Sequence, residues 1–217
     1  GRDRLYFPNQ PLRLAAISGG PQLVGPQPHD PAFLAAIGGF SSPIGPNVSP
    51  RDLQMPGAPR HYRLGVHQGS DFYWSLGSPV YAVADGTVIR AMHDYTPPFP
   101  AEFFAWQAEA QQLGYTSEEA LDFYRGRQVW IQHANGLVSR YVHLDSIDYR
   151  IQEGQPVTQG QLIGTVGNSG SPGSLESEDS DVHLHFELWL GDHYLGQFLR
   201  PVETRYWIER ILLGRAP

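Results

Sequence analysis

Glycine turns separate short runs of β-branched and aromatic residues over most of this chain, from about residue 61 to residue 200. Asp85-Gly86 and Asn135-Gly136 each stand between two such runs, a pattern that predicts a β-hairpin. The predicted hairpin strands are 79–84 with 87–90, and 128–132 with 137–142. Between 153 and 167, glycines recur every few residues around single apolar positions, which suits tight corners. We therefore predict a mostly β fold, a small barrel or sandwich.

Two segments depart from this β pattern. Residues 99–126 are rich in Ala, Glu, Gln and aromatic residues, and they have helical propensity over 101–113. Thr116-x-x-Glu119 resembles a capping box and predicts a second helix that ends near Tyr124. We expect this helical pair to be inserted into the β core. Residues 201–213 predict a short docking helix at the C-terminal end.

Prolines concentrate at the N-terminal end, where residues 1–60 hold eleven of the nineteen. Because proline removes a backbone donor and interrupts helices, we expect a Pro/Gly-rich extended arm, with a two-turn helix only over 30–38. The predicted organisation has three parts. They are an N-terminal arm (1–60), a β domain (61–203, with the helical insertion at about 99–126) and a C-terminal tail (204–217).

The composition excludes several classes of function. The chain has no Cys, which excludes disulfides and thiolate metal sites, and all fifteen of its basic residues are Arg, which excludes amine chemistry. The net charge of −7 argues against a nucleic-acid partner. No apolar run approaches the roughly 20 residues that span a bilayer, so we expect no membrane span in this chain. Because it begins with Gly, we expect a processed or trimmed chain from which any signal peptide or anchor has been removed.

Two clusters of potential metal ligands stand out among the nine histidines. Strand alternation places His183, His185 and Glu187 on one face of a predicted strand. His67 and Asp71 are four residues apart, which brings both side chains to the same side of a strand or a helix. Alone, His183 and His185 are explained equally well by polar residues on a solvated sheet face, and His67 and Asp71 are better explained by a structural His–Asp hydrogen bond. Together, their imidazole nitrogens and carboxylate oxygen suit Zn²⁺.

A hydrolytic zinc site has three protein ligands and one open position. Four donors, from His67, Asp71, His183 and His185, would close the site, so one histidine should stay off the metal. His143 lies at the end of the second predicted hairpin and is a further candidate for the same groove. The alternative for His143 is a surface histidine at a strand end.

Five motifs stand in a distinctive order over about 61–203. They are His67-x-x-x-Asp71, Gly77-x-Pro79-Val80-x-Ala82-x-x-Asp85-Gly86, Arg140-Tyr141-x-His143-Leu144, Gly154-x-x-Val157-x-x-Gly160-x-x-Ile163-Gly164 and His183-Leu184-His185-Phe186-Glu187. This order resembles the lysostaphin-type zinc metallopeptidases, also called LytM-like murein endopeptidases. The resemblance implies a barrel-sandwich of the duplicated hybrid motif type, interrupted here by the helical insertion.

The resemblance also implies a role for each matching residue. His67, Asp71 and His185 would hold Zn²⁺, while His143 and His183 would lie beside the metal as catalytic residues and exchange protons with water and the leaving amine. The family cuts stem or bridge peptides of bacterial peptidoglycan and is exported, so we expect a periplasmic, cell-surface or extracellular endopeptidase. Peptidoglycan peptides are the expected partners, and a monomer is expected.

Three features fall outside the family pattern. The loop 174–181 is acidic, and we interpret it as a solvated tip rather than a selector of cationic substrates. Tyr62 or His61, just upstream of the first ligand, is a candidate for contact with the transition state. The arm could lie across the groove as an inhibitory segment, with Asn47 on the zinc.

Two other functions fit part of the sequence. Glycine corners of this kind also occur in biotinyl/lipoyl carriers, which the lack of Lys excludes, and in histidine phosphoacceptor domains, which leave His67-x-x-x-Asp71 unexplained. The main alternative is a non-catalytic cell-wall-binding module or an activator of other wall hydrolases. Stoichiometric zinc argues against the phosphoacceptor, and wall binding without cleavage would identify the module.

Overall fold

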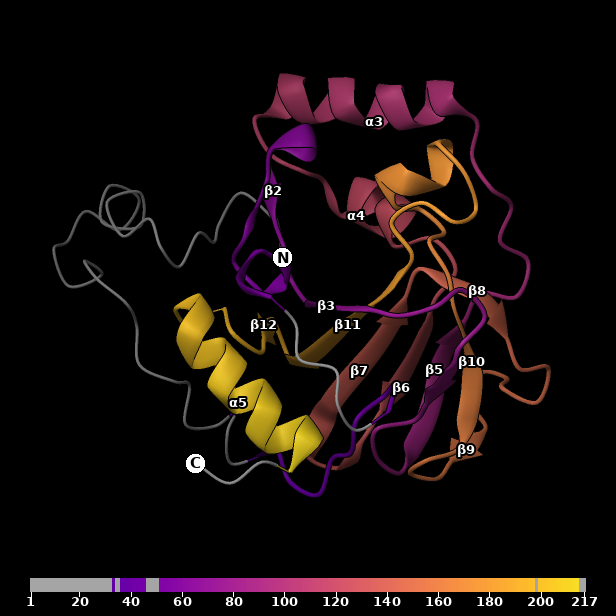
Figure 1. The fold of residues 1–217 in the computed structure, drawn as a ribbon, viewed down its shortest axis with the longest axis vertical. Coiled ribbons are helices and arrows are strands. Elements are labelled where there is room, and N and C mark those ends of the chain that lie inside the picture. The colour runs from indigo at the N-terminus through magenta and orange to yellow at the C-terminus, as the bar shows by residue number, and fades with distance from the viewer. Residues whose placement is uncertain (1–32, 34–35, 46–50, 198, 215–217) are drawn as a thin grey trace, which may run out of the picture.

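A computed structural model describes residues 33, 36–45, 51–197 and 199–214, and its largest element is an antiparallel sheet of seven strands (Figure 1). In hydrogen-bonded order, six of its strands are β12 (His193–Tyr194), β11 (His183–Leu190), β7 (Leu137–Val142), β6 (Val129–Gln132), β5 (Gly86–Ala91) and β9 (Pro156–Val157). The seventh strand, β3 (Ser70–Tyr73), also pairs with β11. This arrangement places β11 between β3 and β7.

Two smaller sheets complete the β structure. The first has the order β4 (Pro79–Tyr81), β10 (Leu162–Val166) and β8 (Leu144–Ile147). The second pairs β1 (Pro59–Arg60) with β2 (Gly65–Val66). The predicted mostly β fold is confirmed, and over the described residues the strand pairings do not close into a barrel.

The core lies between the large sheet and the three-stranded sheet. Side chains from both sheets belong to one buried apolar cluster, including Val80 and Ile163 from the small sheet and Ile131, Tyr141 and Leu184 from the large one. On β11 the apolar residues alternate with polar ones, as in a strand whose two faces meet different neighbours. The apolar face of β11 is thereby fixed on the core.

One of the two predicted hairpins is wrong. The second is confirmed, because β6 and β7 pair around a turn in which Gly136 has φ 77°. The first does not form, because β4 pairs with β10 while β5 pairs with β6 and β9. Residues between β4 and β5 instead carry the chain from one sheet to the other. Gly86 is needed there for close approach, since a Cβ on it would lie 2.5 Å from the carbonyl oxygen of Gln132.

The predicted helical pair is confirmed as α3 (Pro100–Leu113) and α4 (Glu118–Arg125), which lie on the same side of the large sheet (Figure 1). The start of α4 differs by one residue from the prediction. Ser117 is its N-cap, and its Oγ accepts from the backbone N–H of Ala120 at 3.2 Å. Thr116 is buried and donates to the carbonyl of Arg63 at 2.6 Å, so it anchors the insertion to the segment before β2.

The predicted C-terminal helix is confirmed as α5 (Pro201–Leu213), whose Ile208 and Leu212 are buried in the main core. This helix crosses the predicted domain boundary at residue 203. Among the described residues, no helix is long and apolar enough to cross a membrane. The core therefore extends into the predicted tail.

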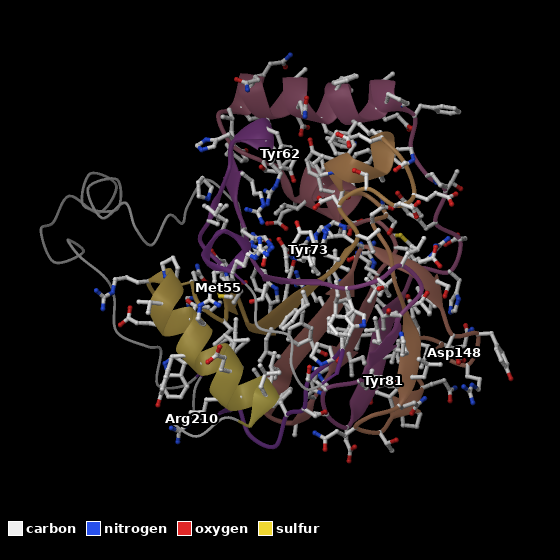
Figure 2. The ribbon with its side chains drawn as sticks, viewed as in Figure 1. Met55, Tyr62, Tyr73, Tyr81, Asp148 and Arg210 are labelled. Atoms are coloured by element: carbon white, nitrogen blue, oxygen red, sulfur yellow. The ribbon has the colours of Figure 1, made fainter. Side chains whose placement is uncertain are left out.

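The described part of the predicted N-terminal arm also packs against the core. Phe33, Ile44 and Met55 belong to the main apolar cluster, and Met55 lies beside the upper end of α5 (Figure 2). Phe33 and Ala36 are helical, while the other residues of the predicted 30–38 helix lie mostly outside the described part of the chain. Short 3₁₀ turns at Asp52–Gln54 and His61–Arg63 flank β1. The boundary placed at residue 60 stays a prediction.

Candidate metal centre

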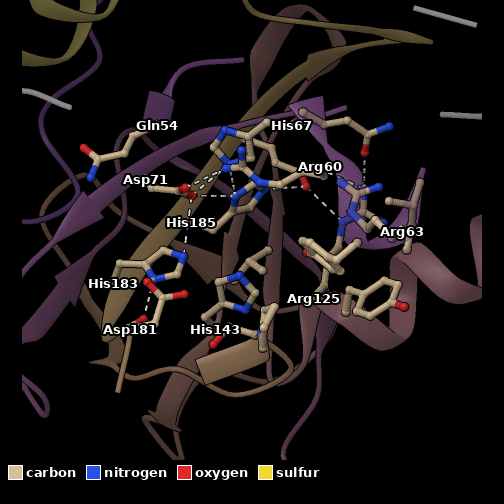
Figure 3. A pocket seen from close by; sticks show the side chains of 18 of the residues that line it. Gln54, Arg60, Arg63, His67, Asp71, Arg125, His143, Asp181, His183 and His185 are labelled. Carbon is tan, nitrogen blue, oxygen red and sulfur yellow. Dashed lines mark hydrogen bonds and ion pairs between the residues drawn. The ribbon is translucent and has the colours of Figure 1, made fainter. Parts of the chain in front are cut away.

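All five residues predicted for the site line one cavity of about 360 Å³. Strand register brings them together, because His185 on β11 lies opposite Asp71 on β3 and opposite Val142 on β7. His143 directly follows Val142, and His67 precedes β3. Residues far apart in the sequence therefore meet where β11 is held between its two neighbours (Figure 3).

Three side-chain atoms form a compact triangle in this cavity. His67 Nε2 lies 2.8 Å from Asp71 Oδ1 and 2.8 Å from His185 Nδ1. His185 Nδ1 lies 2.9 Å from the same carboxylate oxygen. All three side chains are buried, so the solvated sheet face considered above is wrong for β11. These are the three residues predicted as metal ligands, and their role as ligands stays a prediction.

Hydrogen bonds behind the triangle fix which nitrogens carry protons. His67 Nδ1 lies 3.1 Å from the carbonyl oxygen of Met55, which only accepts, so Nδ1 donates and Nε2 presents a lone pair. His185 Nε2 lies 2.9 Å from Glu187 Oε1, so this nitrogen donates and Nδ1 faces the triangle. Two imidazole lone pairs and a carboxylate oxygen thus face one another at short distances. A cation bound between them would remove the repulsion among these three atoms. The donor set and its supporting hydrogen bonds fit zinc.

The pKa values of the two histidines predicted as ligands shift in opposite directions. Burial lowers the pKa of His67 to about 3, which keeps this imidazole neutral and able to ligate. Burial also acts to lower the pKa of His185, but hydrogen bonds to Asp71 and Glu187 outweigh it, and the net direction is upward. The two carboxylates therefore favour positive charge beside His185, and a divalent cation would supply that charge.

Asp71 has one oxygen available for a metal. Its Oδ2 accepts from Arg60 Nη2 at 3.0 Å, while Oδ1 belongs to the triangle. Burial acts to raise the pKa of Asp71, but its contacts with His67, His183 and His185 hold it well below its usual value. Asp71 is therefore an ionised, one-oxygen donor.

His183 and His143 flank the triangle. His183 Nδ1 donates to the carbonyl of Asp181 at 2.6 Å, and its Nε2 lies 3.6 Å from Asp71 Oδ1. His143 Nδ1 donates to the carbonyl of Ser169 at 2.7 Å. Each Nε2 is therefore a proton acceptor. The two rings lie 4.8 Å apart between centroids, close enough to act on one substrate group.

His143 has an unusual backbone for a residue with a side chain. Its φ is 61°, in the left-handed region, and its N–H donates to the carbonyl of Arg125 at 3.1 Å. Burial, together with the neighbouring His183 and His185, lowers the pKa of His143 well below its usual value, so the ring is neutral. This strained, half-buried position is typical of a functional residue rather than of a surface histidine.

The structure bears on two of the three features outside the family pattern, the candidates Tyr62 and His61 and the acidic loop. Tyr62 lines the cavity, whereas His61 is exposed and is not among the lining residues. Asn47 lies outside the described residues, so the inhibitory arm remains a prediction. In the acidic loop Glu176, Glu178 and Asp179 are exposed, as expected of a solvated tip. Asp181 lines the cavity and accepts from the Tyr73 hydroxyl at 2.6 Å.

Sequence reasoning missed the residues that hold the ligands in place. Two of them lie in the predicted arm, where no motif marks them. Arg60 donates to Asp71, and the carbonyl of Met55 accepts from His67. Glu187 was placed on the correct strand face by alternation, but its contact with His185 was not predicted. Arg125 is the last residue of α4, and no motif in the sequence marks it. Glu187 could have been found by a search for charged residues on strands that are predicted to lie between two neighbouring strands.

Gly69 is a position where the site tolerates no side chain. A Cβ there would lie 2.8 Å from His185 Nε2 and 2.5 Å from the carbonyl oxygen of Phe186. We expect Gly69→Ala to weaken zinc binding at least about tenfold and to destabilise the fold by roughly 1–3 kcal/mol. Chelator competition and thermal unfolding measure the two effects. Gly38→Ala is the matched control, because a Cβ there meets nothing within 4 Å; equal effects of both substitutions would contradict the prediction.

Comparisons with known proteins agree with this geometry. Residues 108–196 match peptidase family M23. This range includes three of the five residues predicted for the site, His143, His183 and His185. The chain is 32% identical over 145 residues to the peptidoglycan DD-endopeptidase ShyA of Vibrio cholerae, covering 67% of this chain and 24% of ShyA. It is 27% identical to the DD-carboxypeptidase/endopeptidase Mpg of Neisseria meningitidis, covering 81% of this chain and 31% of Mpg.

The fold is also similar to that of a zinc-containing peptidase from Vibrio cholerae. The TM-score is 0.47 with 24% sequence identity, and the match covers 73% of this chain and 39% of that structure. The chain spans about a quarter of the length of ShyA. With the family match and the sequence relatives together, the chain carries a peptidase M23 domain.

Proposed function

We propose that this chain is a zinc-dependent endopeptidase that hydrolyses peptide bonds in the stem or bridge peptides of bacterial peptidoglycan. The observation that carries the proposal is the buried triangle of His67, Asp71 and His185, with His143 and His183 held beside it by backbone carbonyls. Peptidases of family M23 are zinc-dependent, which agrees with this donor set. By their names, ShyA is a peptidoglycan DD-endopeptidase and Mpg is a DD-carboxypeptidase/endopeptidase. The peptidoglycan substrate is carried over from ShyA as part of the proposal.

His67, Asp71 and His185 would hold the metal in this reaction. Zinc, when bound, would lower the pKa of a water molecule and polarise a carbonyl group of the substrate. Because the Nδ1 of His143 and of His183 donates to a backbone carbonyl, each Nε2 would accept the proton of the attacking water and return it to the departing amine. Their Nδ1–H groups are held by backbone carbonyls, which keeps both rings oriented during the exchange.

Tyr62 would contribute to the same step from the cavity wall. Burial raises the pKa of Tyr62, so its hydroxyl keeps its proton and can donate a hydrogen bond to the developing oxyanion. We propose this role for Tyr62 and not for the exposed His61. The proposed location is outside the cytoplasm, where peptidoglycan lies, and the proposed state is a monomer.

Digestion of purified peptidoglycan tests the proposal. We expect soluble fragments whose masses identify the bond that is cut, loss of these fragments when a chelator removes the metal, and their return when zinc is added back. A non-catalytic wall-binding module would sediment with peptidoglycan and release nothing under any of these conditions. Binding without release would therefore contradict the proposal.

A further inference from the structure

The inserted helix α4 ends directly behind the metal centre, and its last residue is Arg125. The Arg125 side chain is buried, and its Nε donates to Glu187 Oε1 at 2.9 Å. Its Nη2 donates to Gln68 Oε1 at 2.8 Å and to Glu187 Oε2 at 3.3 Å. The Arg125 guanidinium, labelled in Figure 3, therefore has two partners beside predicted ligands. Glu187 contacts His185, and Gln68 directly follows His67 in the sequence.

Glu187 connects Arg125 to the metal ligand His185. Its Oε1 accepts both from Arg125 and from His185 Nε2, the latter at 2.9 Å. Its Oε2 accepts from Arg140 at 3.2 Å and from the Trp189 indole N–H at 2.6 Å. Arg125 thus fixes the place of the oxygen that orients His185.

The end of α4 also supports the neighbouring catalytic candidate. The carbonyl of Arg125 accepts from the N–H of His143 at 3.1 Å. The following Gly126 lies so close to Ser169 that a Cβ would overlap the Ser169 carbonyl, the same group that accepts from His143 Nδ1. The insertion therefore contacts the support of both a metal ligand and a flanking histidine.

We propose that Arg125 is a positioning residue of the metal centre that acts on His185 through Glu187. The end of α4 is thereby part of the centre. The inference rests on the proposed function, because it assumes that His185 binds zinc. Positioning through outer hydrogen bonds raises metal affinity without direct contact with the metal. The bidentate geometry matters, since a lysine ammonium cannot present the same planar set of donors.

The test measures zinc affinity by competition with a chromophoric chelator, and the visible absorption of Co²⁺ bound in place of zinc. We expect Arg125→Gln to weaken zinc binding about tenfold and to alter the Co²⁺ band. Arg90→Gln is the matched control: it removes an ion pair of 2.7 Å between β5 and Asp122 of α4 but contacts no part of the centre. We expect this control to bind zinc as the parent chain does.

A double-mutant cycle with Glu187→Gln decides the mechanism. If Arg125 acts through Glu187, the losses of zinc affinity in the two single variants are not additive in the double variant. If Arg125→Gln does not fold, Arg125→Lys keeps the buried charge, and the proposal still predicts weaker zinc binding. Unchanged affinity in the folded Arg125 variants, or full additivity with Glu187→Gln, would overturn it. No peptidoglycan enters these measurements, so a failed digestion would refute the proposed function and leave this result standing.

Discussion

Replacing His185 by alanine is expected to abolish stoichiometric zinc binding and to reduce peptidoglycan hydrolysis to the level of a blank without protein. The substitution removes one of three atoms that lie within 2.8–2.9 Å of one another. It also leaves Glu187 without the imidazole that it accepts from. Metal content by mass spectrometry and fragment release from purified peptidoglycan measure the two effects.

A second histidine variant provides the control for this experiment. His93 is exposed, and its Nε2 contacts the carbonyl of Ile151 at 2.6 Å, away from the centre. We expect His93→Ala to keep one zinc ion per chain and the parent rate. If His185→Ala also kept its zinc, the third donor would have to be another group, and His183 would be the first candidate because of its 3.6 Å approach to Asp71.

Substitution of the two flanking histidines is expected to separate metal binding from turnover. His183→Ala should keep zinc, while the hydrolysis rate falls by about 10²–10⁴ because a positioned proton acceptor is lost. For residue 143 the informative variant is His143→Asn, since asparagine tolerates the left-handed backbone with φ 61° better than other residues. The measurement pairs the rate of fragment release with the zinc content of the same sample.

Two outcomes would contradict the assigned roles. Loss of zinc from His183→Ala would make this residue a ligand and would close the site with a fourth donor. Retention of the parent rate in both variants would remove the flanking histidines from the reaction. In that case the proton would have to pass through Tyr62 or Asp181, which line the same cavity.

Strand alternation predicted that His183 and His185 share a face, and the family resemblance predicted that His67, Asp71 and His143 lie beside them. All five side chains line one cavity, while their roles stay predictions. Once His183 and His185 share a face of β11, pairing of β11 with β3 brings Asp71 opposite His185. Local sequence rules failed at Asp85-Gly86, because a glycine required for close approach leaves the same pattern as a glycine required for a turn. Arg60 and Arg125 could not be predicted, since their contacts depend on how distant segments pack.

The hydrogen bond between His67 and the Met55 carbonyl has a consequence for the smallest fragment that retains the centre. A fragment starting at residue 61 would lack the acceptor that leaves His67 Nε2 unprotonated, and it would also lose Arg60 from Asp71. A fragment ending at residue 203 would cut α5 before Ile208 and Leu212. The minimal unit for zinc-binding studies therefore begins upstream of Met55 and ends after Leu213.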